Sequence, residues 1–160
     1  MYKPEHVQGW KRVTDFVHKH TQSKIALQLG HAGRKASAQR PWKGGGPLTQ
    51  ADAPDLPWTT FSASSLPYDP AAKWHTPVAL DAAGLRRVKQ SFVTAVERSA
   101  RLGFDLVEVH GAHGYLLHQF LSPLSNTRSD DDMPLPEYSL RVFISTPLQN
   151  NQLKQILMIG

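Results

Sequence analysis

The stretch Phe104-Asp-Leu-Val-Glu-Val-His-Gly-Ala-His-Gly-Tyr115 decides the fold class of this 160-residue chain. Its first six residues form a short, largely apolar run that directly follows a long amphipathic pattern, as expected of a buried parallel strand entered from a helix. The amphipathic pattern predicts a helix over residues 82–102, with Asp81 as its N-cap and Gly103 at its end. The apolar stripe of this helix consists of Leu85, Val88, Phe92, Val96 and Ala100.

A second helix-and-strand pair precedes this one. Residues 4–20 carry apolar side chains at spacings of three and four, which predicts a helix that proline suits at its first position. The run Ile25 to Leu29 then predicts a short buried strand that ends at Gly30. Helix, strand, long loop, helix, strand is the alternation of a parallel α/β sheet or barrel. The apolar stripe of the first helix consists of Val7, Trp10, Val13 and Val17, with Phe16 alongside.

Two segments lack clear periodicity. Residues 30–76 contain three consecutive glycines and many prolines, which predicts a long loop of the kind that is functional or disordered. Trp42, Trp58 and Trp74 favour at least partial packing of this loop. Beyond Asp132 no amphipathic element is evident, and the short apolar runs at 142–144 and 156–159 are weak candidates for strands.

Composition narrows the function classes. The net charge is +5, but the longest basic cluster, Arg86 to Lys89, falls on a predicted helix and indicates a solvated face rather than a nucleic-acid surface. The absence of cysteine excludes disulfides, thiolate zinc sites and cysteine nucleophiles, and it fits a reducing compartment. No apolar run approaches the ~20 residues needed to cross a bilayer, and the first residues lack a signal-peptide pattern. We therefore expect a cytoplasmic protein without a nucleic-acid or membrane partner.

Four polar side chains stand at or just after the ends of the two predicted strands: Gln28, His110, His113 and Tyr115. Functional groups gather at the carboxyl ends of parallel strands, so adjacent strands would aim all four at one pocket. An amide offers both a donor and an acceptor to the edge of a planar heterocycle. Two histidines could donate to a substrate oxygen or bind a metal, and a phenol could deliver a proton.

Each of these residues also has a structural interpretation. Gln28 could satisfy backbone groups in a buried strand, and Tyr115 could be an ordinary packed aromatic residue. Lone histidines are usually structural or exposed. A metal site is weakly supported, because His110 and His113 supply two imidazoles and Glu108 or His31 would have to complete the set without a carboxylate motif.

Two longer segments resemble a known family. These are Gln28-Leu-Gly-His-Ala-Gly-Arg-Lys35 and the stretch from Phe104 to Asn126, which contains His-Gly-Ala-His-Gly-Tyr-Leu-Leu-His-Gln-Phe-Leu-Ser-Pro-Leu-Ser-Asn. Both resemble Old Yellow Enzyme relatives, in the bacterial-type ene-reductase or NADPH dehydrogenase branch. Gly9 to Val13 and Asn126 to Asp130 extend the similarity to roughly residues 5–131.

The resemblance implies a TIM barrel that binds FMN non-covalently, takes electrons from NADPH or NADH, and reduces the C=C bond of α,β-unsaturated carbonyl compounds. A homo-oligomer is compatible with it. By position, Gln28 resembles the glutamine that contacts the flavin pyrimidine edge, and Lys35 would line the same pocket. His110 and His113 resemble the pair that holds the substrate carbonyl oxygen, and Tyr115 resembles the acid that protonates the α-carbon.

The sequence also departs from the family. A complete barrel takes about 250 residues, and by family order these segments resemble the third and fourth βα units of a chain truncated at both ends. The first two strands, the flavin-contacting arginine and the phosphate-binding loops are not found. Where the family continues into Tyr-Gly-Gly-Ser and Glu-Asn-Arg patterns, this chain reads Asp132-Met-Pro-Leu-Pro-Glu-Tyr138. We expect a partial barrel over 1–132 and an unassigned tail over 133–160, frame-shifted or intron-derived.

Three functions follow from these patterns. The first is an FMN-dependent ene-reductase. The second is a non-catalytic fragment or pseudoenzyme, which would lack flavin and melt at low temperature without cooperativity. The third is a histidine-metal hydrolase on a similar barrel, which metal analysis would reveal.

Overall fold

The computed structural model describes residues 3–52, 54–129 and 155–159, the last of these by backbone only. The chain forms two compact units. The first comprises Met1–Gly30, Ala83–Gly111 and Leu140–Gly160, and the second comprises His31–Ala82 and Ala112–Ser139. The chain therefore passes from the first unit into the second directly after each of the two predicted strands.

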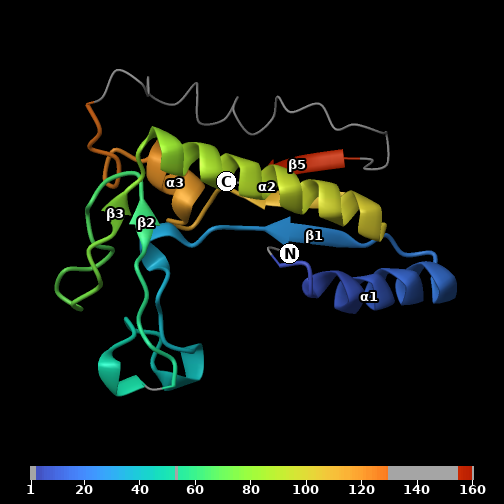
Figure 1. The fold of residues 1–160 in the computed structure, drawn as a ribbon, viewed down its shortest axis with the longest axis horizontal. Helices are drawn as coiled ribbons and strands as arrows, with labels where there is room; N and C mark the ends of the chain where they lie inside the picture. Colours follow the sequence, from blue (N-terminus) through green and yellow to red (C-terminus); the bar gives the residue numbers. More distant parts are fainter. Residues whose placement is uncertain (1–2, 53, 130–154, 160) are drawn as a thin grey trace. The chain divides into compact units, whose positions relative to one another are not determined.

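The first unit is built on a parallel sheet (Figure 1). Its strands are β1 (Ala26–Leu29), β4 (Leu106–His110) and β5 (Gln155–Ile159), in the order β1-β4-β5. Both pairings are parallel, and β1 and β4 are in a register that places Gln28 opposite Glu108. The predicted adjacency of the first two strands is confirmed. The weak strand candidate at 156–159 lies within β5, and the one at 142–144 lies outside the described residues.

The two faces of this sheet differ in character. Four alternating aliphatic side chains are buried on one face, together with apolar residues of α2 (Ala82–Leu102), which runs beside the sheet in Figure 1. The opposite face carries Gln28, which is exposed, and Glu108, which is half-buried. This alternation is the period of two that a strand imposes. The buried set consists of Leu27, Leu29, Val107 and Val109 from the strands and Phe92, Ala95 and Val96 from the helix.

The helix α2 has the bounds predicted from its periodicity, and Gly103 ends it with a positive φ of 86°. Glycine adopts this left-handed conformation without steric cost, which is why it commonly follows the last helical turn. The amide of Gly103 donates to the carbonyl of Ala100. The next residue, Phe104, is buried with 2% exposure and starts the core contacts of the unit.

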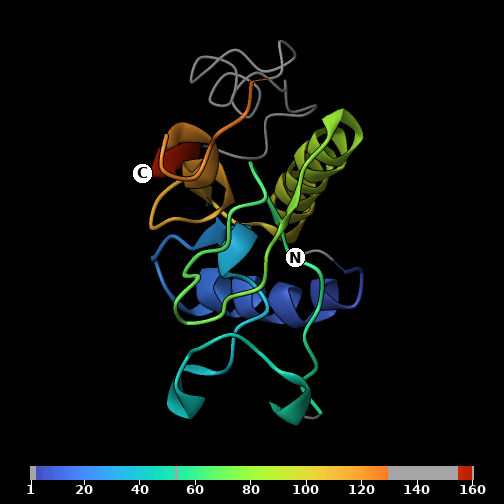
Figure 2. The same cartoon turned by 90° about the vertical axis from the view of Figure 1, so that its left-hand side faces the viewer.

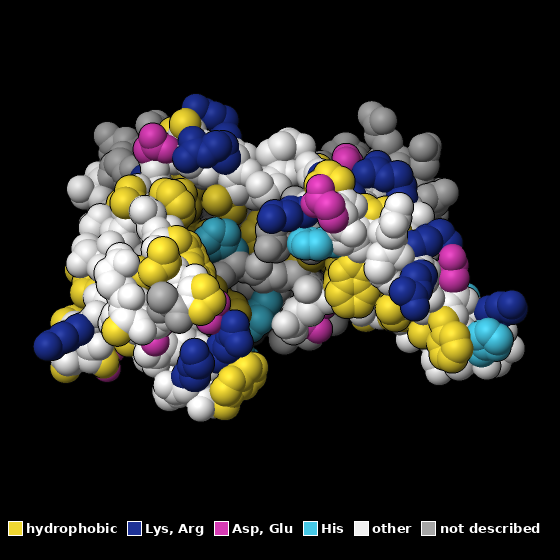
Figure 3. Space-filling view, turned by 60° about the horizontal axis from the view of Figure 1, so that its bottom comes forward, with side chains coloured by type: hydrophobic (Ala, Val, Ile, Leu, Met, Phe, Trp, Pro, Cys, Tyr) yellow, Lys and Arg dark blue, Asp and Glu magenta, His cyan; other side chains and the backbone are white. Residues whose placement is uncertain are grey.

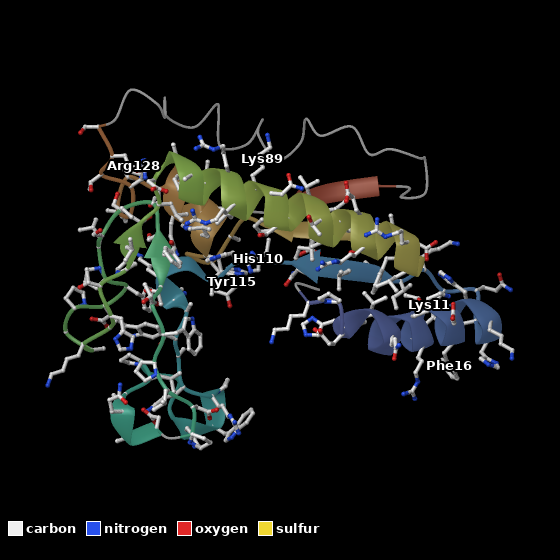
Figure 4. The ribbon with its side chains drawn as sticks, in the orientation of Figure 1. Lys11, Phe16, Lys89, His110, Tyr115 and Arg128 are labelled. Atoms are coloured by element: carbon white, nitrogen blue, oxygen red, sulfur yellow. The ribbon has the colours of Figure 1, made fainter. Side chains whose placement is uncertain are left out.

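The helix α1 (His6–His20) begins two residues later than predicted, because Pro4 lies in a turn whose carbonyl accepts from the Val7 amide at 3.0 Å. The apolar side chains of this helix are only partly buried: Trp10, Val13 and Phe16 are 37%, 44% and 62% exposed. Figure 4 shows Phe16 on the side of α1 turned away from β1. Of the apolar stripe, Trp10 contacts Phe104, with the two rings edge-on and their centroids 5.7 Å apart.

Thr14 is the buried residue of α1, and its hydroxyl donates to the carbonyl of Leu102 at 2.6 Å. This bond satisfies a carbonyl at the end of α2, where the helix itself supplies no partner.

Thr14→Val keeps the shape of the side chain but leaves the Leu102 carbonyl unpaired, so we expect a loss of about 1–3 kcal/mol of stability. Urea unfolding would measure it. Thr21→Val is the control, since Thr21 is exposed and bonds within its own helix; equal losses from both variants would contradict this role.

Asp105 joins the starts of the two strands. Its carboxylate accepts from His18 Nε2 at 2.9 Å and from the Ile25 amide at 3.1 Å, and Lys24 Nζ lies 3.4 Å away. The hydrogen bond from His18 is the main reason that the pKa of Asp105 is lowered to about 2, with the Ile25 amide and Lys24 adding to it. The ionised carboxylate therefore stabilises the folded unit.

This pKa sets a pH dependence. A carboxyl whose folded pKa is depressed contributes stability that is fully present above its unfolded pKa, about 3.9, and is lost as the pH falls through its folded pKa. We expect the stability of the first unit to fall between about pH 4 and the folded value of about 2. Asp105→Asn should flatten this part of the profile. An unchanged acid limb in the variant, measured by urea unfolding at each pH, would rule Asp105 out as its cause.

The second unit contains the long loop and a short helix. Its elements are η1 (Gly33–Lys35), η2 (Pro41–Lys43), η3 (Gln50–Asp52), β2 (Phe61–Ser62), β3 (Val78–Ala79) and α3 (Leu116–Leu121). The strands β2 and β3 pair in parallel. Figures 1 and 2 both place η2 and η3 at the tip of the loop between η1 and β2.

The loop is partly packed, as Leu48 and Ala63 are 4% and 0% exposed. Arg128, from the end of the described segment, donates to the carbonyls of Ala63 and Leu80 and so ties together the ends of β2 and β3.

The loop tryptophans differ in exposure. Trp74 meets Tyr68 edge-on at 5.2 Å. Trp42 and Trp58 are 78% and 55% exposed. The partial packing expected of the loop therefore rests on Trp74, Leu48 and Ala63 more than on these two indoles.

Among the described side chains on the face drawn in Figure 3, lysines and arginines are scattered between hydrophobic and uncharged groups. No helix in the described part of the chain is long and apolar enough to cross a membrane.

Candidate functional site

In the first unit, the polar face of the sheet brings three side chains together. Gln28 of β1 donates from Nε2 to Oε1 of Glu108, its register partner on β4. His110 lies two residues beyond Glu108 at the carboxyl end of β4, on the same face because strand side chains alternate (Figure 4). Sequence reasoning had placed Gln28 and His110 at neighbouring strand ends, and the structure confirms that placement. It adds Glu108 as the residue that orients the amide.

In the second unit, His113 occupies a strained turn. Its φ is +56°, which is uncommon for a residue other than glycine, and Gly114 follows with a φ of +71°. Non-glycine residues held in this region cost of order 1–3 kcal/mol and cluster at functional sites. The side chain of His113 is exposed. Two bonds brace the turn: Lys35 Nζ donates to the carbonyl of His113 at 2.9 Å, and the Tyr115 amide donates to the carbonyl of Ala112 at 3.1 Å.

Lys35 is thus close to His113, as the resemblance implied. Its ammonium group is bonded within the second unit. Besides the His113 carbonyl, it lies over the Tyr68 ring, 4.5 Å from the centroid. These contacts fix the side chain beside the turn. Whether Lys35 also contacts a cofactor stays a prediction.

Tyr115 stands at the start of α3. It is half-buried and has an extended backbone, with a φ of −78° and a ψ of 176°, and its carbonyl accepts from the Gln119 amide at 2.9 Å. The phenol therefore projects from the residue directly after the strained turn, at the N-cap of α3. The structure brings Tyr115, His113 and Lys35 together in the second unit, as it brings Gln28 and His110 together in the first.

The metal interpretation receives no support from His31. Its Nδ1 accepts a hydrogen bond from the Gly33 amide at 3.0 Å, and burial lowers its pKa, so the ring is neutral near pH 7 with its proton on Nε2. No group of three or more acidic or histidine side chains within the described ranges is arranged to hold a metal ion.

Gln119 is the residue that sequence reasoning missed. It is fully buried, and its amide bonds four partners in the second unit. A signal was present: α3 reads Leu-Leu-His-Gln-Phe-Leu, and Gln119 is a polar residue on the face where Leu116 and Phe120 are buried. A polar group in such a position needs hydrogen-bond partners, which makes it a marker of internal structure.

The parallel βα units, with polar side chains at the carboxyl ends of β1 and β4, define the chain as part of a (β/α) barrel, in agreement with the solved structures that it resembles. It matches morphinone reductase with a TM-score of 0.67 and 26% identity, over 89% of this chain and 38% of that one. It matches Old Yellow Enzyme from Pichia sp. AKU4542 with a TM-score of 0.67 and 28% identity, over 89% of this chain and 36% of that one.

Sequence relatives agree with this class. The chain is 37% identical to an NADH:flavin oxidoreductase of Gibberella zeae, over 82% of this chain and 31% of the relative. It is 37% identical to the NADPH dehydrogenase of Bacillus subtilis, over 88% of this chain and 36% of the relative. The model of the NADH:flavin oxidoreductase / NADH oxidase family matches residues 1–134. The chain belongs to this family, that of Old Yellow Enzyme, and spans about a third of the length of these curated relatives.

Membership confirms the predicted partial TIM barrel and the predicted cofactor class, because the family is one of FMN-dependent oxidoreductases that use NADH or NADPH. The predicted boundary between a barrel part at 1–132 and a tail at 133–160 falls largely on residues outside the described ranges, and it stays a prediction.

Proposed function

We propose that this chain carries the substrate-binding part of an FMN-dependent NAD(P)H oxidoreductase that reduces the C=C bond of α,β-unsaturated carbonyl compounds. The observation that carries the proposal is the pair of polar groups that follow the two parallel strands. Gln28 and His110 share a face at the carboxyl ends of β1 and β4, and His113 follows in a strained turn. Family membership supplies the reaction class.

The residues present fit one part of the flavin. A pyrimidine edge needs a donor and an acceptor side by side, which one amide supplies. The bond to Glu108 uses one of the two amide hydrogens of Gln28, and the side chain is exposed on the open face of β1. Gln28 would therefore hold the flavin edge through its oxygen and its second hydrogen, with Glu108 setting the direction of the amide. The resemblance assigns Lys35 to the same cofactor.

The two histidines would bind the carbonyl oxygen of the substrate. FMN, when bound, supplies the hydride that reaches the β-carbon. As negative charge grows on the carbonyl oxygen, ring N–H groups of His110 and His113 would stabilise it. The hydroxyl of Tyr115 would give its proton to the α-carbon. These roles belong to the proposal.

A non-catalytic fragment or pseudoenzyme is the second candidate. The observation that favours it is the exposure of apolar side chains on α1, where Val13 and Phe16 are 44% and 62% exposed. Exposed apolar surface marks a contact site or an aggregation liability where it is contiguous. We further propose that residues 1–132 form the barrel part and that residues 133–160 form a tail outside the family resemblance, although its strand β5 pairs with β4.

The deciding experiment is the visible absorbance spectrum of the purified chain, before and after FMN is added, and then with NADPH under anaerobic conditions. Uptake of flavin followed by bleaching on addition of NADPH would support the oxidoreductase. No uptake by the folded chain would favour the fragment. FMN uptake is compared between the unaltered chain and Gln28→Leu. Gln90→Leu, on the exposed side of α2, is the control.

A further inference from the structure

The amide of Gln119 has four hydrogen-bond partners in the second unit. Its Nε2 donates to the carbonyls of Gly114 at 2.7 Å and Ala32 at 3.3 Å. Its Oε1 accepts from the Ser62 hydroxyl at 2.9 Å and the Arg34 amide at 3.3 Å. Both hydrogens and both lone pairs of the amide are therefore used.

These partners come from three separate segments. Ala32 and Arg34 flank the first residue of η1, Ser62 belongs to β2, and Gly114 is the second residue of the strained turn. One side chain thus joins the long loop, the small sheet and the turn that carries His113.

The turn needs such a brace. His113 and Gly114 both have positive φ, and the left-handed conformation is unfavourable for histidine. Two long side chains hold the carbonyls of this pair: Lys35 holds that of His113, and Gln119 holds that of Gly114. Lys35 itself follows Arg34, whose amide is bonded to Gln119. Gln119 consequently acts on the turn directly and also through the lysine.

We propose that Gln119 is the positioning residue for His113: it fixes the turn that sets the direction of this imidazole. The inference rests on the proposed function for its consequence at the substrate, while the link between Gln119 and the turn is independent of it. Glutamine suits the role because two carbonyls require donors and an amide and a hydroxyl require an acceptor. Methionine offers neither group, and an ionised glutamate offers acceptors to carbonyl oxygens.

The test compares Gln119→Met and Gln119→Glu with the unaltered chain, and uses Gln90→Met as the control for the same substitution at an exposed site. Nuclear magnetic resonance measures the φ of His113, from its backbone couplings and shifts, without FMN. In Gln119→Met we expect His113 to leave the left-handed region while the amides of β1 and β4 keep their protection. In Gln119→Glu we expect the native φ at low pH, where the carboxylic acid can donate, and its loss as the buried acid ionises.

A native φ for His113 in both variants at all pH values would overturn the proposal. If Gln119→Met unfolds the second unit as a whole, Gln119→Glu decides. A reversible change in the φ of His113 with pH, while the amide of Leu80 that bonds Ser62 keeps its protection, supports the positioning role. Loss of both together, which ionisation of any buried acid would cause, counts against it. If the unaltered chain binds FMN, Gln119→Met should lower the kcat/KM for an enone about tenfold or more, mainly through kcat, without slowing flavin reduction by NADPH. Absence of FMN binding in the unaltered chain would count against the proposed function and leave the result for His113 standing.

Discussion

Gly33→Ala is expected to destabilise the second unit by about 2–5 kcal/mol, as the sum of two effects. Gly33 has a φ of +61°, a conformation that costs an alanine about 1–2 kcal/mol. In addition, a Cβ at this position would overlap the amide of Gln119, closer than van der Waals contact permits. The amide would have to move away from partners that are themselves buried, and each unpaired group costs about 1–3 kcal/mol.

Gly45→Ala separates the two effects. Gly45 has a φ of +70° and lies in the same unit, but an added Cβ there meets nothing within 4 Å. It should therefore show the backbone cost of about 1–2 kcal/mol without the overlap. Hydrogen exchange of the amides of Leu80 and Gln119, which bond Ser62 and Tyr115, would measure the stability of the unit. Equal losses in the two variants would show that the Gln119 side chain can move aside at no cost in stability.

The elements that could be predicted from sequence are those specified by local pattern. The helix α2 was placed correctly because its periodicity is long and Gly103 ends it at a position where a residue with a side chain is disfavoured. The strands β1 and β4 were recognisable as short apolar runs between helices, and their parallel pairing follows from the alternation of elements.

What sequence could not supply was the identity of the covering partner. The apolar stripe of α1 shows that a face is hydrophobic, but not which segment packs on it, and Phe16 is exposed. Trp42 and Trp58 are likewise exposed although indoles favour burial. Local periodicity records a preference for burial, whereas burial itself depends on contacts that are distant along the chain.

The candidate site, like the fold, could be predicted from the sequence only in part. Gln28, His110, His113 and Tyr115 were identified from residue type, position after a strand and resemblance to the family. The features that hold them were not: the bond from Gln28 to Glu108 spans 80 residues, and that from Lys35 to His113 spans 78. The positive φ of His113 is likewise imposed by its surroundings and runs against the preference of the residue.

If the proposed function is correct, His110→Ala and His113→Ala should each lower the rate of enone consumption by about 10²–10³, the effect of removing one donor from a developing oxyanion. The reason is that the negative charge on the carbonyl oxygen exists mainly in the transition state, so each lost N–H raises the barrier more than it weakens binding. Because both imidazoles would hold the same oxygen, the double variant should lose less than the product of the two single losses. The measurement is enone-dependent NADPH oxidation by the FMN-loaded chain.

His118→Ala provides the matched control, since His118 is an exposed histidine on α3. It should leave enone consumption unchanged, and none of the three variants should alter the rate at which NADPH bleaches bound FMN when no enone is present. That second rate separates a defect at the substrate oxygen from a defect in cofactor binding. If His110→Ala and His113→Ala behave like His118→Ala, the two histidines do not bind the carbonyl. If they instead abolish FMN uptake, their role is in holding the cofactor or the fold, and the assignment of the oxygen-binding pair fails.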